Sequence, residues 1–252
     1  MSNDPRPVAL VTGASYGLGG AIAETLARDG FDVAVTELDP ADLADTLAAI
    51  DAAGGQSLGV ALDLRNDASI IACSDAVLER FGRIDLLVNN AAMLLAKPAI
   101  DVAAEEFEAV MRINVTGTYM MTQQVGRHLI EAGRSGQIIN IASTFTTIGA
   151  VNVSPYGISK AAIGGMTRHL AAEWAPHDIR VNAVAPTFFR TNFGAGYMQS
   201  NPGLVDEIEA STPMGRFGEP WELAGGLLYL ASPASSMVTG VTLPIDGGWT
   251  AA

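Results

Sequence analysis

Short apolar runs alternate with longer stretches of helical periodicity along the whole chain. Continuous apolar runs are typical of strands that are buried on both faces, and helices repeat their apolar positions every three to four residues. The pattern predicts seven strands, at Val8–Val11, Val33–Val35, Leu58–Leu62, Ile84–Val88, Ile138–Ile141, Ile179–Val184 and Val241–Ile245. It predicts helices from the first strand to Arg28 and over Pro40–Ala53, Asp67–Phe81, Glu105–Glu131, Pro155–Trp174 and Pro220–Leu230.

This alternation of strand and helix favours right-handed crossovers and therefore an α/β fold with a doubly wound parallel sheet. No linker rich in Pro, Gly or Ser divides the chain and no repeat is visible, so we expect one domain over residues 1–252. The segment Thr187–Thr212 is the longest without a predicted element, which is typical of a functional loop that covers a substrate.

Composition narrows the class of protein. The 252 residues are 49% hydrophobic and 16% charged, which excludes a disordered chain. The net charge of −13 disfavours nucleic acid and anionic membranes as partners, because both require clustered Lys and Arg. A single cysteine and three separated histidines predict neither a disulfide framework nor a metal site. Without an apolar run of membrane-spanning length or an apolar N-terminal signal, we expect a soluble cytoplasmic protein.

A glycine-rich turn joins the first predicted strand to the first predicted helix. It reads Thr12-Gly13-Ala14-Ser15-Tyr16-Gly17-Leu18-Gly19. Glycines at such a turn let the backbone approach a pyrophosphate, and the helix N-terminus offers N–H groups to the anion. Tight turns also need glycine for conformational reasons alone, so its place in an α/β chain gives the motif its weight.

Several motifs together resemble the short-chain dehydrogenase/reductase family in its single-domain form of about 250 residues, and the resemblance covers essentially the whole chain. Those motifs are Thr12–Gly19, Asn89-Asn90-Ala91-Ala92, Asn114, Ser143, Tyr156-x-x-x-Lys160, Asn182–Pro186 with Thr191, and Asp246-Gly247-Gly248. The resemblance implies a seven-stranded Rossmann fold. Two residues depart from the usual family pattern, since Ala92 and Thr187 stand where Gly is common.

Cofactor choice is predicted from the end of the second strand. Glu37 lies 18 residues beyond Gly19, where a carboxylate can accept hydrogen bonds from both ribose hydroxyls of NAD and repel a 2′-phosphate. The neighbouring Tyr16 and Leu38 are uncharged, so the cofactor is predicted to be NAD. Together with the turn and the resemblance, this gives a predicted cofactor site of Gly13, Ser15, Tyr16, Gly17, Leu18, Gly19, Glu37, Leu38, Asp63, Leu64, Asn90, Ala91, Tyr156, Lys160, Pro186, Phe189 and Thr191.

Tyr156 and Lys160 are four residues apart in a helical pattern and so share one face. Alcohol oxidation needs a base for the hydroxyl proton, and we expect the Lys160 ammonium to lower the pKa of Tyr156 for that task. The Ser143 hydroxyl is expected to hold the substrate oxygen. By resemblance, Asn114 and its backbone hold a water that links Lys160 to solvent in a proton relay.

The substrate pocket is expected to use side chains that vary across the family. The predicted substrate site is Ser143, Phe145, Tyr156, Phe188, Met93 and Leu95, with Leu94, Thr144, Thr146, Tyr197 and Met198 as further candidates. Arg190 can meet a carboxylate, although a solvated arginine is the simpler interpretation.

The predicted activity is hydride transfer between NAD and a secondary alcohol or ketone, with a sugar, sugar acid, polyol or cyclic alcohol as small-molecule substrate. The stretches 212–220 and 246–251 resemble gluconate 5-dehydrogenase-like and 3-oxoacyl carrier-protein reductase-like members of the family. An NADPH-dependent 3-oxoacyl carrier-protein or general carbonyl reductase is the alternative. A sugar epimerase or dehydratase of the extended family is disfavoured by length, and an NAD-binding regulator by the complete catalytic set. Family members are commonly homotetramers, so a homotetramer or homodimer is expected.

Overall fold

The computed structural model describes residues 6–191, 198 and 203–251. Seven parallel strands form one sheet in the order β3-β2-β1-β4-β5-β6-β7. The strands are β1 (Val8–Val11), β2 (Asp32–Glu37), β3 (Ser57–Ala61), β4 (Leu86–Asn89), β5 (Gly136–Ile141), β6 (Ile179–Pro186) and β7 (Thr242–Ile245). The predicted doubly wound α/β fold is therefore confirmed.

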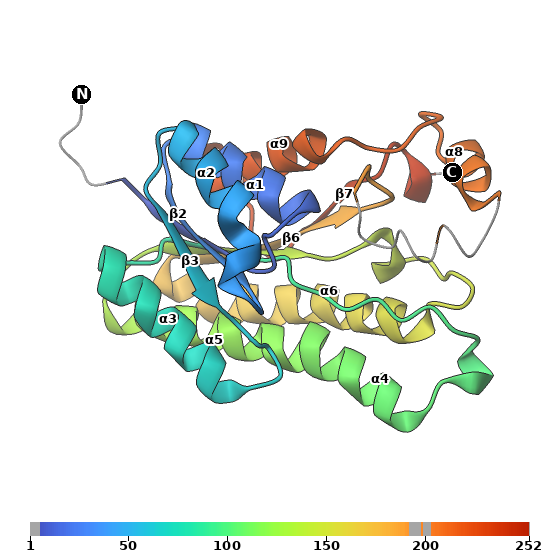
Figure 1. Ribbon diagram of the computed structural model, residues 1–252, viewed down its shortest axis with the longest axis horizontal. Coiled ribbons are helices and arrows are strands. Elements are labelled where there is room, and N and C mark those ends of the chain that lie inside the picture. Colours follow the sequence, from blue (N-terminus) through green and yellow to red (C-terminus); the bar gives the residue numbers. More distant parts are fainter. Residues whose placement is uncertain (1–5, 192–197, 199–202, 252) are drawn as a thin grey trace.

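Helices cover both faces of the sheet (Figure 1). One face carries α1 (Gly17–Arg28), α2 (Ala44–Ala52) and α9 (Pro220–Ala231). The other carries α3 (Asp67–Phe81), α5 (Thr118–Glu131) and α6 (Ser154–Trp174), and α4 (Ala104–Met111) precedes α5 on that side. A further helix, α8 (Leu204–Ser211), lies at the end of the molecule where the C-terminus is found.

Alternating residues of β1 enter two separate cores. Ala9 and Val11 pack with the α1 and α9 side chains, whereas Val8 and Leu10 pack with those of α3, α5 and α6. A central parallel strand is therefore apolar at every position, which is why its sequence shows a run rather than an alternation.

The predicted boundaries hold best where the chain carries its own stop signals. Helix α3 begins after Asn66, whose side chain accepts hydrogen bonds from the amides of Ala68 and Ser69. It ends at Gly82, which takes a left-handed φ of 74°. Both ends match the predicted Asp67–Phe81.

Two predicted segments need correction. The helix expected without interruption over Glu105–Glu131 contains a π-helical stretch, Arg112–Gly117, between α4 and α5. The segment expected to be irregular over Thr187–Thr212 contains α8, which buries Ile208. An eight-residue helix of this kind depends on tertiary packing, because isolated helices this short are unstable in water.

Within the described residues, no helix is both long and apolar enough to cross a membrane. The same residues contain no group of three or more His, Cys, Asp or Glu side chains arranged to hold a metal ion.

Candidate active site

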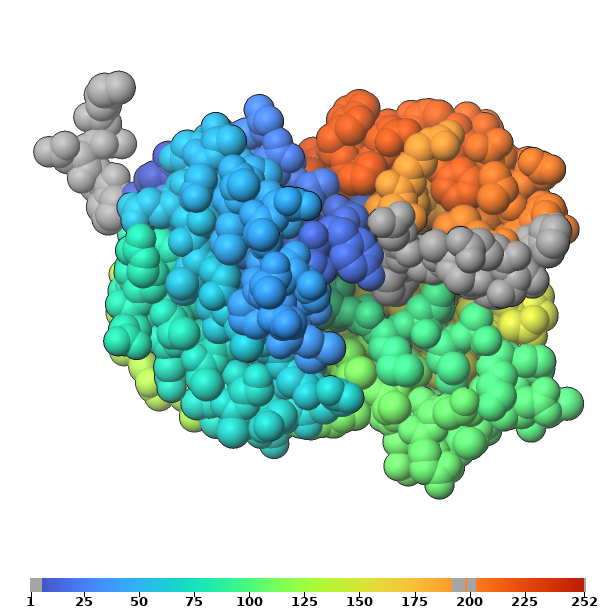
Figure 2. Space-filling model, viewed as in Figure 1, coloured from blue at the N-terminus to red at the C-terminus, as the bar shows by residue number. Residues whose placement is uncertain are grey.

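A cavity of about 780 Å³ opens at the carboxyl ends of the strands. The last residue of β2 and residues that follow β1, β4, β5 and β6 contribute to its wall. In Figure 2 the blue N-terminal part of the chain lies to the left of the orange C-terminal part. Ligands of open α/β sheets bind at this edge, where neighbouring crossovers run to opposite faces.

The glycine-rich turn forms one end of the cavity. Gly13 has a φ of 64°, and a Cβ on it would lie 2.8 Å from the Cα of Ala91. Helix α1 begins at Gly17, and the side chain of Tyr16 before it makes no capping hydrogen bond. The amides of a first helical turn have no partner within the helix, so this end of the cavity is suited to an anion. The turn residues in the wall are Gly13, Ser15, Tyr16, Gly17 and Leu18.

Asn90 ties the end of β4 to the glycine-rich turn. Its side-chain amide donates to the carbonyls of Thr12 (3.1 Å) and Gly13 (2.6 Å). In return, the Thr12 hydroxyl accepts from the amides of Asn90 (3.0 Å) and Ala91 (3.1 Å). This reciprocal pairing fixes the turn against the neighbouring strand. Thr12 is a residue to which sequence reasoning gave no role of its own.

Glu37 stands at the cavity wall where β2 ends. Its Oε2 accepts a 2.7 Å hydrogen bond from the Ser15 hydroxyl, and its Oε1 accepts from the Leu38 amide at 2.9 Å. The carboxylate is thus oriented by the glycine-rich turn itself. Sequence analysis placed Ser15 and Glu37 in one site but did not foresee this bond.

Four predicted cofactor residues are not in the cavity wall, namely Gly19, Leu38, Asp63 and Leu64. Gly19 lies beneath the turn, and Leu64 is buried. The Asp63 carboxylate is held by the Arg65 guanidinium through two 2.9 Å hydrogen bonds. These bonds keep the pKa of Asp63 below its usual value.

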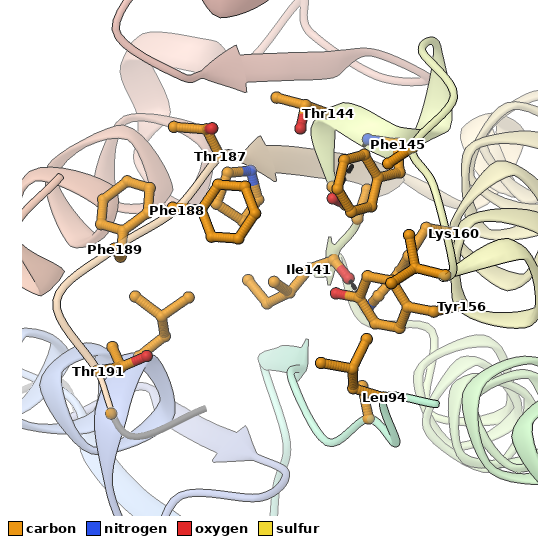
Figure 3. A pocket seen from close by; sticks show the side chains of 18 of the residues that line it. Leu94, Ile141, Thr144, Phe145, Tyr156, Lys160, Thr187, Phe188, Phe189 and Thr191 are labelled. Atoms are coloured by element: carbon orange, nitrogen blue, oxygen red, sulfur yellow. Dashed lines mark hydrogen bonds between the residues drawn. The ribbon is translucent and has the colours of Figure 1, made fainter. Parts of the chain in front are cut away.

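Ser143, Tyr156 and Lys160 meet in the cavity wall. Ser143 lies just past β5, whereas Tyr156 and Lys160 lie one turn apart on α6. Tyr156 is hydrogen-bonded to the Ser143 side chain. The Lys160 Nζ donates to the Ile141 carbonyl at 2.6 Å and lies 5.5 Å from the centre of the Tyr156 ring. Figure 3 shows the phenol oxygen of Tyr156 directed into the cavity.

Burial controls the titration of this pair. It raises the pKa of Tyr156 well above the usual value for a phenol, and the hydrogen bond with Ser143 offsets only part of that rise. Burial also lowers the pKa of Lys160 to about 8. The expected lowering of the Tyr156 pKa by Lys160 is therefore a wrong prediction for the protein itself, because the cost of burying a phenolate is larger.

Asn114 lies in the π-helical stretch between α4 and α5. Its Oδ1 accepts from the Met93 amide at 2.7 Å, and its Nδ2 donates to the Met93 carbonyl (2.9 Å) and to the Ser159 hydroxyl (3.0 Å). Both amide hydrogens are thus used inside the protein, so a relay water here would need the backbone. The Asn114 side chain fastens the segment after β4 to α6.

The substrate end of the cavity is mostly apolar. The ring of Phe188 lies 6.4 Å from Phe145, 6.2 Å from Phe217 and 5.7 Å from Trp249, measured between ring centres. Sequence reasoning missed Trp249, which is far along the chain. It also missed two groups of lining residues, Ile148–Val153 before α6 and Leu204, Glu207, Ile208 and Ser211 on α8.

Of the other substrate candidates, some line the cavity and some do not. Leu94 lines the cavity, whereas Met93 and Leu95 on either side of it do not. Thr144 and Met198 line it, while the Thr146 hydroxyl instead donates to the Lys160 carbonyl at 3.3 Å. Tyr197 lies outside the described residues.

The segment after β6 completes the wall. Pro186, which pairs with Ile245 as the last residue of β6, lines the cavity together with Phe189 and Thr191. Thr187 also lines it, and its hydroxyl oxygen is buried with no hydrogen-bond partner in the part of the chain that the structure describes. Because Pro186 still pairs with Ile245, the Thr187 that follows it leaves the strand pairing intact.

Comparisons with known proteins agree with this geometry. A family model described as Enoyl-(Acyl carrier protein) reductase matches residues 13–250. The chain is 38% identical to a 2-dehydro-3-deoxy-D-gluconate 5-dehydrogenase of Escherichia coli, covering 97% of this chain and 95% of the relative. It is 39% identical to a D-threitol dehydrogenase of Mycolicibacterium smegmatis, covering 96% and 92%.

Among solved structures, it superimposes on a gluconate 5-dehydrogenase from Burkholderia cenocepacia in complex with NADP and tartrate. The TM-score is 0.92 and the identity 32%, and the match covers 98% of this chain and 96% of that one.

Proposed function

Since the chain belongs to the short-chain dehydrogenase/reductase family, whose members oxidise CH–OH groups or reduce the corresponding carbonyl groups, we propose that it transfers hydride between NAD and a secondary alcohol or ketone. The substrate is a sugar, sugar acid, polyol or cyclic alcohol. The observation that supports this most strongly is the meeting of Ser143, Tyr156 and Lys160 in the same cavity wall as the glycine-rich turn and Glu37.

The residues of the wall fit a nicotinamide dinucleotide. Gly13, which has no side chain, packs against Ala91, and the amides at the start of α1 would hold a pyrophosphate at the turn. The Glu37 carboxylate would lie beside a ribose. When bound, the oxidised cofactor supplies the hydride acceptor. At the other end of the cavity, Pro186, Phe189 and Thr191 would border the nicotinamide.

Tyr156 is the acid and base of the proposed reaction. In ketone reduction its phenol donates a proton to the substrate oxygen, and in alcohol oxidation the phenolate removes the hydroxyl proton. Ser143 holds the same oxygen by a hydrogen bond. Because burial raises the pKa of Tyr156, the protonated form prevails at neutral pH. Oxidation should accordingly have a more alkaline optimum than reduction.

The choice of NAD rests on Glu37. Its carboxylate, oriented by Ser15, would accept hydrogen bonds from a free ribose 2′-hydroxyl and repel a 2′-phosphate. The similar protein from Burkholderia holds NADP, whereas a 3-ketoacyl-(acyl-carrier-protein) reductase from Brucella melitensis holds NADH, so proteins similar to this one bind either cofactor. The alternative is an NADPH-dependent 3-oxoacyl carrier-protein reductase, and the matching family model, described as an enoyl reductase, shares with it only the acyl carrier-protein substrate.

A paired kinetic experiment tests the proposal. NAD(H) and NADP(H) are compared by reduced-nicotinamide absorbance with alcohols and ketones of these classes, using the intact protein and the Tyr156→Phe variant. We expect NAD(H) to be preferred, and the variant to lose at least about a thousandfold in kcat while still binding NADH. Wild-type turnover by the variant would refute the role of Tyr156. Preference for NADPH with 3-oxoacyl thioesters would favour the alternative.

The protein is also expected to act in the cytoplasm as a homotetramer or a homodimer. Tyr119 on α5 and Ile158 on α6 are large hydrophobic side chains that the single chain leaves exposed, as an interface between copies requires. Light scattering coupled to size-exclusion chromatography measures the mass of the assembly directly. A mass equal to that of one chain would contradict the proposed homotetramer or homodimer.

A further inference from the structure

We infer that the substrate is uncharged and carries a hydrocarbon ring, so that among the proposed classes a neutral cyclic secondary alcohol or its ketone fits this cavity best. The inference rests on the proposed function, because it concerns the substrate of that same reaction. It follows from where the positive charges of the chain lie, from one carboxylate in the cavity wall, and from the rings around it.

All fourteen Lys and Arg side chains of the protein lie within the described residues, and only Lys160 lines the cavity. Its Nζ already donates to the Ile141 carbonyl beside Tyr156. A carboxylate substrate is normally held by Arg or Lys through charge-assisted hydrogen bonds. No second cation among the described residues stands in the wall to serve that purpose.

Most of the other cations are engaged elsewhere. Nine pair with carboxylates: Arg6, Arg28, Arg65, Arg83, Lys97, Arg112, Arg134, Arg190 and Arg216. Arg80 donates to the Gln56 side chain, and Arg180 to backbone carbonyls. The remaining two, Arg127 and Arg168, are not in the cavity wall, and neither is any histidine.

Arg190 is the cation whose place in the sequence best suits a substrate carboxylate. Its Nε lies 3.0 Å from the Glu219 carboxylate, and its guanidinium carbon 5.9 Å from the centre of the Phe217 ring. It is absent from the wall, although Thr191 beside it is present. The ten residues at 192–197 and 199–202 contain no Lys, Arg or His in their sequence, so they offer no cation either.

The wall instead carries a negative charge at its substrate end. Glu207 on α8 lines the cavity with Leu204 and Ile208 of the same helix. Glu37, the other acidic lining residue, belongs to the nucleotide end. A substrate carboxylate would therefore leave water for a region that offers it like charge and no added cation, which is unfavourable.

Aromatic rings shape the space beside the catalytic pair. Phe145 packs edge-on against Tyr156, with 6.3 Å between ring centres, and Phe188 lies next to Phe145. Figure 3 shows these two rings on the same side of the cavity, with Leu94 across it near Tyr156. Trp249 adjoins Phe188. Such a surface favours an apolar ring over an open-chain polyol, because burial of hydrocarbon supplies the binding energy.

The test uses substrates of nearly equal size that differ in charge. Oxidation of methyl 4-hydroxycyclohexanecarboxylate by the NAD-loaded protein is compared with oxidation of 4-hydroxycyclohexanecarboxylate, and sorbitol is compared with gluconate. We expect kcat/KM to be at least about a hundredfold higher for the ester than for the acid, and higher for the ester than for either open-chain compound. Equal or faster oxidation of the acids would overturn the inference.

Two variants of α8 provide the matched comparison. Glu207→Gln removes the carboxylate in the wall. The gap, meaning the ratio of kcat/KM for the ester to kcat/KM for the acid, should narrow about threefold to tenfold in this variant. Asp206→Asn removes an adjacent charge that is not in the wall, and should leave the gap as it was. An unchanged gap in Glu207→Gln, or the same narrowing in both variants, would contradict the part assigned to Glu207.

Failure of the proposed function has a different signature. If none of these compounds is turned over although NADH binds, the proposed reaction class is wrong. Calorimetric binding of ester and acid to the NADH-loaded protein then tests the charge inference on its own. Tighter binding of the ester supports it, and equal or tighter binding of the acid overturns it.

Discussion

The Nζ atom of Lys160 lies 2.6 Å from the carbonyl oxygen of Ile141, so a buried cation on α6 is held at the end of β5. Burial lowers the pKa of Lys160 to about 8 from an ordinary value of 10.5. Between these values the unfolded chain binds more protons than the folded one, so this residue makes the free energy of unfolding rise with pH.

The Lys160→Met variant should lack that contribution. Its stability relative to the wild-type protein should fall by about 3 kcal/mol between pH 7 and pH 10.5, and should be constant below pH 7. Urea unfolding at a series of pH values measures the difference, in which other titrating groups largely cancel. A stability difference that does not vary with pH would show that the pKa of Lys160 is not lowered in the folded protein.

Glu37 should determine cofactor preference. Removal of its carboxylate in Glu37→Ala deletes a charged hydrogen-bond acceptor and the repulsion of a 2′-phosphate, so the ratio of kcat/KM for NAD to that for NADP should fall about tenfold to a hundredfold. Asp39→Ala is the control, because Asp39 lies two residues away, accepts from the Ala41 amide and does not line the cavity. Equal shifts in both variants would indicate a general effect of charge.

Two adjacent glycines of α1 should respond differently to alanine. A Cβ on Gly19 would collide with the Gly13 carbonyl oxygen and lie 2.6 Å from the Asn90 side-chain nitrogen, whereas on Gly20 the nearest atom is the Thr46 hydroxyl oxygen at 3.3 Å. We expect Gly19→Ala to cost at least about 2 kcal/mol of stability and to weaken NADH binding. Gly20→Ala should change stability by less than about 1 kcal/mol. Thermal unfolding and NADH fluorescence titration compare the two, and similar losses would contradict the close packing of the turn.

Asn114 should matter for stability more than Ser159. Asn114→Leu leaves the Met93 amide and carbonyl without their partner and should cost about 2–4 kcal/mol. Ser159→Ala removes the acceptor of one Asn114 amide hydrogen and the donor to the Tyr156 carbonyl, whose other lone pair stays available within the helix, and should cost about 1 kcal/mol. Because the two side chains share a hydrogen bond, the double variant should lose less than the sum of the single losses. Additive losses in urea unfolding would show that the bond contributes nothing.

The fold was predictable because parallel strands leave a strong local pattern. Each strand is a short apolar run, and Asn66 with Gly82 marks both ends of α3. The π-helical stretch at Arg112–Gly117 was not predictable, since its apolar positions continue the periodicity of the helices on either side. Helix α8 has only eight residues and directly follows Gly203, so its sequence is too short to show a clear helical pattern.

The place of a candidate residue in the cavity wall was predictable where a motif fixes that residue on a regular element, as with Tyr156 and Lys160 on α6. It was less so on irregular segments. Which of Met93, Leu94 and Leu95 faces the cavity depends on how Asn114 binds the backbone of Met93, a contact between distant parts of the chain. The pKa of Tyr156 depends on burial, which a spacing of four residues does not reveal.

The order of the strands also determines how the chain reaches this structure. β1 lies between β2 and β4, and the Val8 amide bonds to Asp85, 77 residues along the chain. All pairings in the sheet are parallel, so no hairpin is available as a local nucleus and long loops must close before the centre forms. Refolding should therefore be slow for a protein of this size. Until β4 arrives, β1 exposes an unpaired apolar edge, which makes early intermediates prone to self-association.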